Sequence, residues 1–301
     1  MIRQFKIICI LCASLLLWSS CTDVIDIHLN PTESRLVVDA WLNTKPEAQT
    51  IRLTRSQSYF DNTFASGIAS AEVSVDNDLG QTFLFTDHGD GNYIWTPDST
   101  ETLGEVGTQF SLRILWDGKQ YSANSEIKRV PQIDSIQIEV RKDELGYADG
   151  HYAAMFARDF PGTGDTYWIK AYKNGQYLNK PQELNIAYDA AFDAGGEIDG
   201  IVFIPPIREL INRYPDPDTG DDFDVPPYAP GDTVHVEIHS ITGDAFQFLQ
   251  TARDQMTNGD NTIFAIPIAN TKGNVFNDAD GSPVLGYFCV SAVSEATRVV
   301  E

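Results

Sequence analysis

The chain has 301 residues, of which 42% are hydrophobic and 11% aromatic, and its 43 acidic side chains outnumber 21 basic ones. This apolar content excludes general disorder, because it is enough to build folded cores, and the length is sufficient for two domains of ordinary size. The net charge of −22 excludes ordinary nucleic-acid binding, which needs clustered Lys and Arg to displace counterions from phosphates.

Residues 1–20 have the layout of a bacterial lipoprotein signal peptide. A positive start (Arg3 and Lys6) precedes a short apolar core at residues 7–17, and small residues lead into Cys21. An apolar run of about ten residues is half of the roughly 20 that span a bilayer, so we expect this segment to be removed. The prediction is lipidation at Cys21, where several acyl chains, palmitate among them, would hold the protein stably on a membrane. An ordinary secretory signal cleaved nearby is the alternative.

The positions of the other three cysteines show which of them remain in the mature protein. Two lie inside the predicted signal peptide, which leaves Cys289 as the single free thiol of the mature protein. Cys289 lies in an apolar, strand-like run at residues 287–290. We therefore expect a buried, small apolar side chain and no disulfide within the chain.

After a short polar tether at residues 21–34, the pattern changes to short alternating runs separated by turn residues. Alternation of apolar and polar side chains is typical of half-buried strands. About seven such runs predict an immunoglobulin-like or transthyretin-like β-sandwich over residues 35–130. The runs lie at residues 36–42, 50–54, 71–75, 81–85, 93–95, 110–116 and 121–122.

A second β-rich domain is predicted over residues 131–301. Pro131 would interrupt a continuous central strand, so the domain boundary is placed near it. Alternating runs follow at residues 133–140, 152–157, 167–172 and 233–239. The fold class is therefore mainly β, with two sandwich units.

Two features distinguish the second domain. Residues 185–232 are the least regular part of the chain and predict a long insertion. Residues 244–257 place apolar side chains at helical intervals, with Thr242 or Asp244 able to cap the start. We expect this one helix to pack on the sandwich.

The insertion contains the candidate partner-binding segment, residues 201–230. It combines apolar and aromatic side chains, which give large contact areas, with prolines that reduce the entropy lost on association. Its acids would attract a basic partner or hold calcium. The alternative is a loop that covers an exposed sheet edge. The candidate residues are Ile207, Tyr214, Asp216, Asp218, Asp221, Asp222, Phe223, Asp224 and Tyr228.

His235, Glu237 and His239 form the most suggestive constellation for metal binding. In a strand, alternate residues share a face and lie about 7 Å apart, so His235 and Glu237 are weak candidates to share one ion. The alternative is a solvated strand face. No nucleotide-binding loop, zinc-protease helix or nucleophile elbow occurs in the sequence, and no catalytic residues are predicted.

Calcium is the one cofactor for which the sequence offers candidate ligands. The acidic stretch at residues 216–224 and the run at residues 277–281 are rich in Asp and Asn, whose oxygens suit calcium. Neither matches the helix-loop-helix calcium template, and plain turns are the alternative for both, because Asp and Asn cap their own backbone.

The chain resembles the outer-membrane lipoproteins of Bacteroidota in the domain-of-unknown-function 4249 family. The resemblance covers the whole mature chain and includes the helix near residues 244–257. It is carried by Cys21 and by residues 71–75, 121–122, 131–135, 231–237 and 285–288. It implies a two-part, β-rich lipoprotein that is often encoded beside a TonB-dependent outer-membrane transporter. It implies no established activity and no catalytic residues.

The predicted function is that of a non-enzymatic, lipid-anchored accessory or binding protein of the outer membrane. It would work with a TonB-dependent transporter in nutrient uptake and would not bind nucleic acid. A structural envelope scaffold without a ligand is the alternative, and a hydrolase comes third. The ligand, the membrane face and the oligomeric state stay open.

Overall fold

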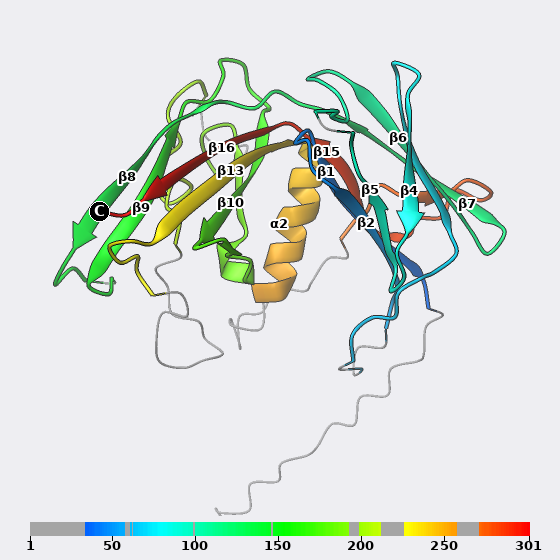
Figure 1. Cartoon of the computed structure of the whole chain (residues 1–301), viewed down its shortest axis with the longest axis horizontal. Helices are drawn as coiled ribbons and strands as arrows, with labels where there is room; N and C mark the ends of the chain where they lie inside the picture. Colours follow the sequence, from blue (N-terminus) through cyan, green and yellow to red (C-terminus); the bar gives the residue numbers. More distant parts are fainter. Residues whose placement is uncertain are drawn as a thin grey trace, which may run out of the picture. The chain divides into compact units, whose positions relative to one another are not determined.

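The structure is a computed structural model of the chain, and its described residues form a mainly β fold with one long helix (Figure 1). The predicted signal peptide, Cys21 and nearly all of the predicted tether lie outside the described residues. Among the described residues, no helix is both long and apolar enough to cross a membrane. The description covers residues 34–301 except 58–60, 62, 99, 146, 193–198, 212–225 and 258–270.

The larger sheet has nine strands in the order β14-β7-β6-β3-β4-β5-β2-β1-β15. Alternate side chains of the longer strands enter one core, as Val38, Ala40 and Leu42 do in β1. This period of two is the pattern from which the strands were predicted. The strands are β1 (Leu36–Asn43), β2 (Gln49–Arg55), β3 (Glu72–Asn77), β4 (Thr82–Asp87), β5 (Asn92–Trp95), β6 (Gln109–Trp116), β7 (Lys119–Glu126), β14 (Phe276–Asn277) and β15 (Leu285–Ser291).

The larger sheet contains strands from both ends of the described chain. β14 pairs antiparallel with β7, and β15 pairs parallel with β1. Gly286 has φ 93°, and a Cβ there would lie 1.9 Å from the carbonyl oxygen of Val38, so the close approach of β15 to β1 requires glycine. The boundary near Pro131 does separate β7 from the next strand. Assigning all of residues 131–301 to a second domain is nevertheless wrong, because β14 and β15 complete the first sheet.

A second sheet and a hairpin enclose another core. The sheet has the order β11-β10-β13-β16, with β12 also paired to β10, and the hairpin is formed by β8 and β9. Val234, Val236 and Ile238 are fully buried against the hairpin in this core. The strands are β8 (Ile133–Arg141), β9 (Gly150–Ala157), β10 (Thr166–Lys173), β11 (Gln176–Tyr177), β12 (Asn185–Tyr188), β13 (Thr233–Ile241) and β16 (Val293–Val299).

The described part of the insertion is more regular than predicted. Its first residues form β12, and the segment 201–211 runs along the free edge of β9. The Met155 amide donates to the Arg208 carbonyl at 2.8 Å, and the Leu210 amide donates to the Ala153 carbonyl at 3.0 Å. Tyr228 continues this edge through paired backbone bonds with His151. The described insertion therefore covers a sheet edge, as the alternative interpretation predicts.

The predicted helix is confirmed as α2 (Gly243–Thr257), which a 3₁₀ turn, η1 (Pro181–Glu183), accompanies. The Thr242 hydroxyl accepts a hydrogen bond from the Ala245 amide at 3.2 Å, so Thr242 caps the helix as expected. Phe246 and Leu249 of α2 pack with Tyr287 and Cys289 of β15 in a third core cluster. Cys289 is buried there, as predicted.

Candidate functional site

Glu237, on β13, is the centre of a buried polar network. Lys45, from the turn between β1 and β2, donates to Glu237 Oε1 at 2.6 Å. Tyr172 and His239 donate to Oε2 at 3.1 and 3.0 Å, and His235 Nε2 lies 3.4 Å from Oε1. The predicted grouping of His235, Glu237 and His239 on one face is therefore confirmed.

The face that carries these residues is buried at Glu237 and His239, whereas His235 is partly exposed. Glu237 is 5% exposed and His239 is 4% exposed, whereas the alternative interpretation expected a solvent-facing strand. Lys45 covers Glu237 from one side, and the Trp168 ring lies beside the His239 ring. The sequence missed this burial because the covering residues come from other strands and from the first sheet.

The network fixes the charges of its members. Burial opposes the charge of Glu237, but the hydrogen bond from His239 and the ion pair with Lys45 outweigh burial and hold the pKa of Glu237 below its usual range. Burial lowers the pKa of His239 to about 4, helped by the positive charges of Lys170 and Lys45, so His239 is neutral at pH 7. Burial would lower the pKa of Lys45, but its hydrogen bond to Glu237 raises that pKa instead.

Two groups of described side chains bring ligand atoms within 4.8 Å of one another, a spacing that one metal ion can bridge. The first is His235, Glu237 and Glu295. Lys45 lies among these three, because its ammonium is 2.6 Å from a Glu237 oxygen and 3.2 Å from a Glu295 oxygen. A metal ion would have to displace the Lys45 ammonium from Glu237 and Glu295. Metal binding by His235 and Glu237 therefore stays a prediction.

The second group is Asp159, Asp189 and Asp199. Asp159 and Asp189 are 1% and 3% exposed, and none of the three forms an ion pair among the described residues. Tyr167 donates to Asp159 at 2.6 Å, the amides of Gly164 and Asp165 donate to Asp189, and the Gly162 amide donates to Asp199 Oδ2. Asp199 Oδ1 is buried and has no hydrogen-bond partner among the described residues. Burial raises the pKa of Asp159. No local motif in the sequence indicates this group, because Asp159 lies between β9 and β10 and the other two lie after β12.

The candidate partner-binding residues do not form an exposed surface where the structure describes them. Ile207 is fully buried and Tyr228 is 2% exposed, and both belong to the core beneath the hairpin. Their assignment as binding residues is wrong, because apolar side chains of a segment that covers a sheet edge turn inward. Tyr214, Asp216, Asp218, Asp221, Asp222, Phe223 and Asp224 lie outside the described residues.

The described calcium candidate, residues 277–281, is a turn whose oxygens are engaged. Asn277 Oδ1 accepts the Ala279 amide and Asp280 Oδ1 accepts the Ser282 amide, each at 2.9 Å. Asp278 accepts hydrogen bonds from Gln120 and Ser122 of β7. This is the arrangement that the turn interpretation predicts. The acidic stretch at residues 216–224 lies outside the described residues.

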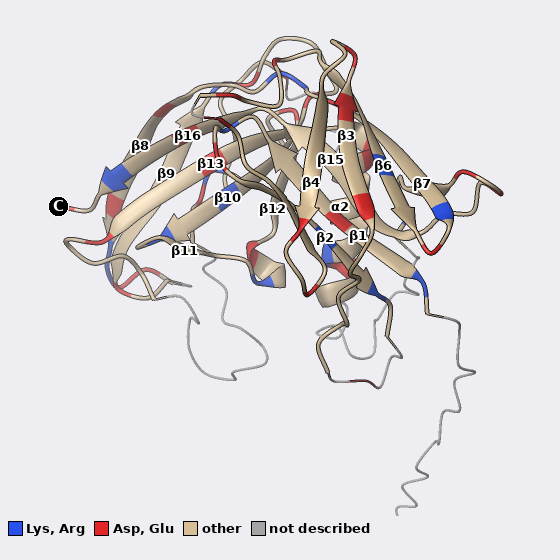
Figure 2. Ribbon diagram, turned by 45° about the vertical axis from the view of Figure 1, so that its right-hand side comes forward, with Lys and Arg blue, Asp and Glu red and all other residues tan. Residues whose placement is uncertain are grey.

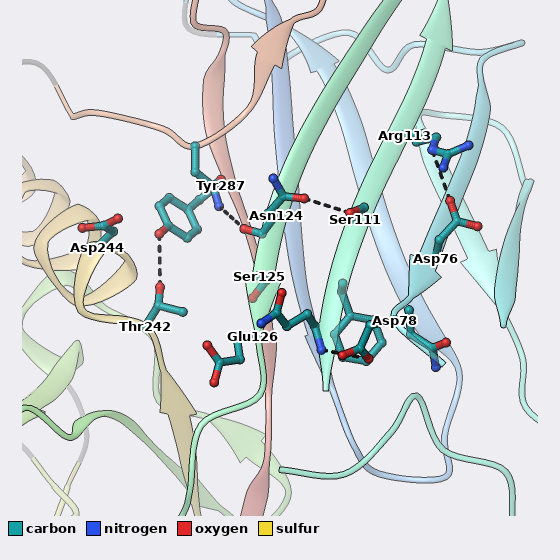
Figure 3. Close-up of a pocket in the computed structure, with 14 residues that line it drawn as sticks. Asp76, Asp78, Ser111, Arg113, Asn124, Ser125, Glu126, Thr242, Asp244 and Tyr287 are labelled. Atoms are coloured by element: carbon teal, nitrogen blue, oxygen red, sulfur yellow. Dashed lines mark hydrogen bonds and ion pairs between the residues drawn. The ribbon is translucent and has the colours of Figure 1, made fainter. Parts of the chain in front are cut away.

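An open hollow of about 540 Å³ lies where β3, β6 and β7 approach the start of α2 (Figure 3). This volume is within the range of sites for small ligands. Figure 3 shows Asp244, Thr242 and Tyr287 at one side of the hollow and Asp76 and Arg113 at the other. Its lining consists mainly of carboxylates, amides and hydroxyls.

Some groups of the hollow maintain the fold and others have no described partner. Asn274 bonds to the backbone of Phe288, and Ser125 accepts the Val290 amide, so both hold β15 in place. Asn124 Oδ1 accepts a hydrogen bond from Ser111, whereas Asn124 Nδ2 and the Asp244 carboxylate have no hydrogen-bond or ion-pair partner among the described residues. The second set is therefore able to contact a ligand without disturbing the sheet.

The hollow has no signature in the sequence. Asp78 follows β3, Asn124 is in β7, Asp244 begins α2 and Tyr287 is in β15, so no local motif connects them. Figure 2 shows acidic positions spread over both sheets and their loops, with fewer basic positions among them. The excess of acid is readable from composition, but which acids line the hollow depends on the sheet order.

The described residues form a mainly β fold with two larger sheets, a two-stranded hairpin and one packed helix. The chain belongs to the family described as the domain of unknown function DUF4249, whose model matches residues 22–297. The matched range includes α2 and both sheets except the last two residues of β16, in agreement with the resemblance. No curated protein matches the chain.

Proposed function

We propose that the chain is a non-enzymatic, lipid-anchored binding protein of the outer membrane that works with a TonB-dependent transporter in nutrient uptake. The polar hollow of Figure 3 is the observation that carries the binding role. Its free amide and carboxylate groups are available to a solute, while neighbouring side chains fix the strands that carry them. The lipid at Cys21 would keep this hollow at the membrane.

The hollow supports binding because two of its polar groups, on Asn124 and Asp244, are held by regular elements. Asn124 is fixed in β7 by the hydrogen bond from Ser111 at 2.8 Å, and Asp244 begins a helix capped by Thr242. Side chains on strands and helices are positioned more rigidly than side chains on loops. A ligand would therefore meet preorganised groups and lose less affinity to their ordering.

The test is genetic complementation in the native host. A strain that lacks the gene is expected to grow poorly when its only nutrient is one that the partner transporter imports. The wild-type gene is expected to restore that growth. The double variant Asp78→Asn and Asp244→Asn is expected to reach the membrane at wild-type level and restore growth poorly. Asp98→Asn and Asp254→Asn, at exposed positions outside the hollow, are matched controls. Full restoration by the double variant would favour the structural scaffold over the binding protein.

A further inference from the structure

We infer that Asp159, Asp189 and Asp199 form a calcium site beside the segment that covers the edge of β9. This inference goes beyond the proposed binding function and does not depend on it. One oxygen from each of the three carboxylates lies within 4.8 Å of the others. Calcium binds oxygens at about 2.4 Å, so two ligands on opposite sides of one ion lie about 4.8 Å apart. A single ion can therefore reach all three carboxylates.

Two of these carboxylates are buried without a basic side chain to neutralise them. Asp159 and Asp189 are almost fully buried, and neither forms an ion pair among the described residues. Arg129 interacts electrostatically with Asp159, but its guanidinium is held by Asp165, whose carboxylate accepts from Arg129 Nε at 2.9 Å. A buried carboxylate is costly unless a cation pairs with it, so a bound cation would stabilise this group.

Two oxygens of the group have no hydrogen-bond donor among the described residues. Asp199 Oδ1 is buried and unpartnered, whereas Asp199 Oδ2 accepts from the Gly162 amide at 3.0 Å. Asp189 accepts both of its hydrogen bonds, from the amides of Gly164 and Asp165, through Oδ1, so its Oδ2 is also without a described donor. Buried oxygens without a donor are uncommon in folded proteins, and a bound ion accounts for them. These two oxygens are therefore suited to be ligands.

The kind of ligand selects calcium among the divalent ions. All three side chains offer carboxylate oxygens, and the group contains no His or Cys, which zinc prefers. The acids come from separate parts of the chain, since Asp159 follows β9 and the other two follow β12. Calcium accepts six to eight oxygens in flexible geometry, whereas magnesium requires a near-ideal octahedron. An irregular set of oxygens therefore favours calcium.

The ion would fasten the edge cover of β9 to the fold. Asp199 lies two residues before the covering segment 201–211, and the Asp159 amide donates to the Ile201 carbonyl at 2.9 Å. The Ile204 amide donates to the carbonyl of Ala190, the residue after Asp189, at 3.2 Å. Calcium would thus connect the end of β9, the turn after β12 and the start of the edge cover.

The test is isothermal titration of the full-length protein, purified in detergent and freed of metal with EDTA that is then removed. CaCl₂ is expected to bind with a Kd of about 0.1 mM, and MgCl₂ at least about tenfold more weakly. About 10 mM CaCl₂ is expected to raise the melting temperature by about 5 °C, because the ion binds only the folded protein.

The variant Asp199→Asn tests the site with little risk to the fold, because Asp199 is the least buried of the three acids. It is expected to weaken calcium binding at least about tenfold, since one charged ligand is lost. Asp134→Asn, on β8, and Asp280→Asn, in the turn at residues 277–281, are matched controls at exposed positions. Both are expected to bind calcium as wild type. Circular dichroism shows whether each variant is folded.

Hydrogen exchange of the wild-type protein locates the ion without any variant. Calcium is expected to slow amide exchange in residues 159–165 and 199–204, because these backbone segments carry or adjoin the ligands. This measurement decides the question if Asp199→Asn does not fold.

Four results would overturn the inference. They are no calcium binding by wild type, equal binding of magnesium, wild-type binding by folded Asp199→Asn, and slowed exchange only outside residues 159–165 and 199–204.

Discussion

Glu237 stays ionised although it is only 5% exposed, because three side chains donate to its two oxygens and a fourth lies within 3.4 Å. Burial of an unpaired carboxylate would cost several kcal/mol, whereas paired and hydrogen-bonded charges are tolerated. Lys45 and Glu237 come from different sheets, so this ion pair also ties the β1–β2 turn to β13. At the residue scale the network is a structural link.

The link predicts a large effect of Lys45→Ala. Removal of the ammonium leaves Glu237 buried beside Glu295, so the free energy of unfolding should fall by about 2–4 kcal/mol. Chemical denaturation at pH 7 measures this change. Adding Glu237→Gln should recover part of the loss, because the unpaired charge is then gone. A double variant no more stable than Lys45→Ala would contradict this account.

The same variant tests metal binding. If Zn²⁺ restores the stability of Lys45→Ala, His235 and Glu237 can hold a metal.

The lowered pKa of His239 makes the free energy of unfolding depend on pH. Its pKa is lowered to about 4 by burial in the folded protein, against about 6.5 when unfolded. The unfolded chain therefore binds a proton more tightly, and stability should fall as pH falls from about 6.5 to about 4, by up to about 3 kcal/mol. Glu237, with a lowered pKa, adds a further loss below about pH 4.5.

The measurement is the melting temperature of wild type and His239→Gln between about pH 7 and pH 4. Glutamine keeps a donor for Glu237 but does not titrate, so the decline between about pH 6.5 and pH 4.5 should be smaller in this variant. An equal decline in both proteins would assign the pH dependence to other groups.

At the element scale, the edge of β9 explains why the insertion is apolar. Segment 201–211 supplies backbone partners to β9 and sends Ile207, Leu210 and Ile211 into the core. A free edge would expose unpaired backbone groups to other chains. The prolines at 205 and 206 lie in this segment, so their role is in an edge cover and not in a described binding surface.

Ile207→Ala tests this role. The side chain is fully buried, so its truncation should lower the free energy of unfolding by about 2–4 kcal/mol. Ile201→Ala is the matched control on the same segment, because that side chain is 42% exposed and its loss should cost less than about 0.5 kcal/mol. Denaturant titration of both variants measures the difference. If Ile207→Ala is as stable as the control, or loses partner capture without losing stability, the binding assignment returns.

The elements differ in how far the sequence predicts them. Alternation located β1, β6 and β13, and helical spacing located α2, because each pattern reports which side chains are buried. Strand partners were not readable, since the parallel pairing of β15 with β1 joins opposite ends of the described chain. The domain assignment failed for this reason.

The candidate sites differ in the same way. The shared face of Glu237 and His239 follows from strand geometry and was predicted, but its burial depends on Lys45 from another sheet. The hollow was not predicted, because Asp78 and Asp244 become neighbours of one cavity only after the two sheets and α2 are assembled. Local sequence patterns therefore predict which side chains lie on the same side of a strand. Tertiary contacts decide whether those side chains are buried or line a cavity.

At the scale of the whole molecule, the proposed function needs three parts to act together. They are an anchor at Cys21, a folded β-rich body and a partner protein in the membrane. The folded body belongs to the DUF4249 family along nearly its whole length. The anchor predicts that Cys21→Ser moves the protein from the membrane fraction into the soluble fraction, because the acyl chains would supply the membrane affinity.

The most direct test of the central claim is native purification of the full-length protein from outer membranes after mild cross-linking. Mass spectrometry should identify a TonB-dependent transporter as the main companion of the wild-type protein. Cys21→Ser, expressed at the same level, should lose both the membrane fraction and this companion. Purification of wild type without any transporter, or with an unchanged companion in Cys21→Ser, would contradict the account.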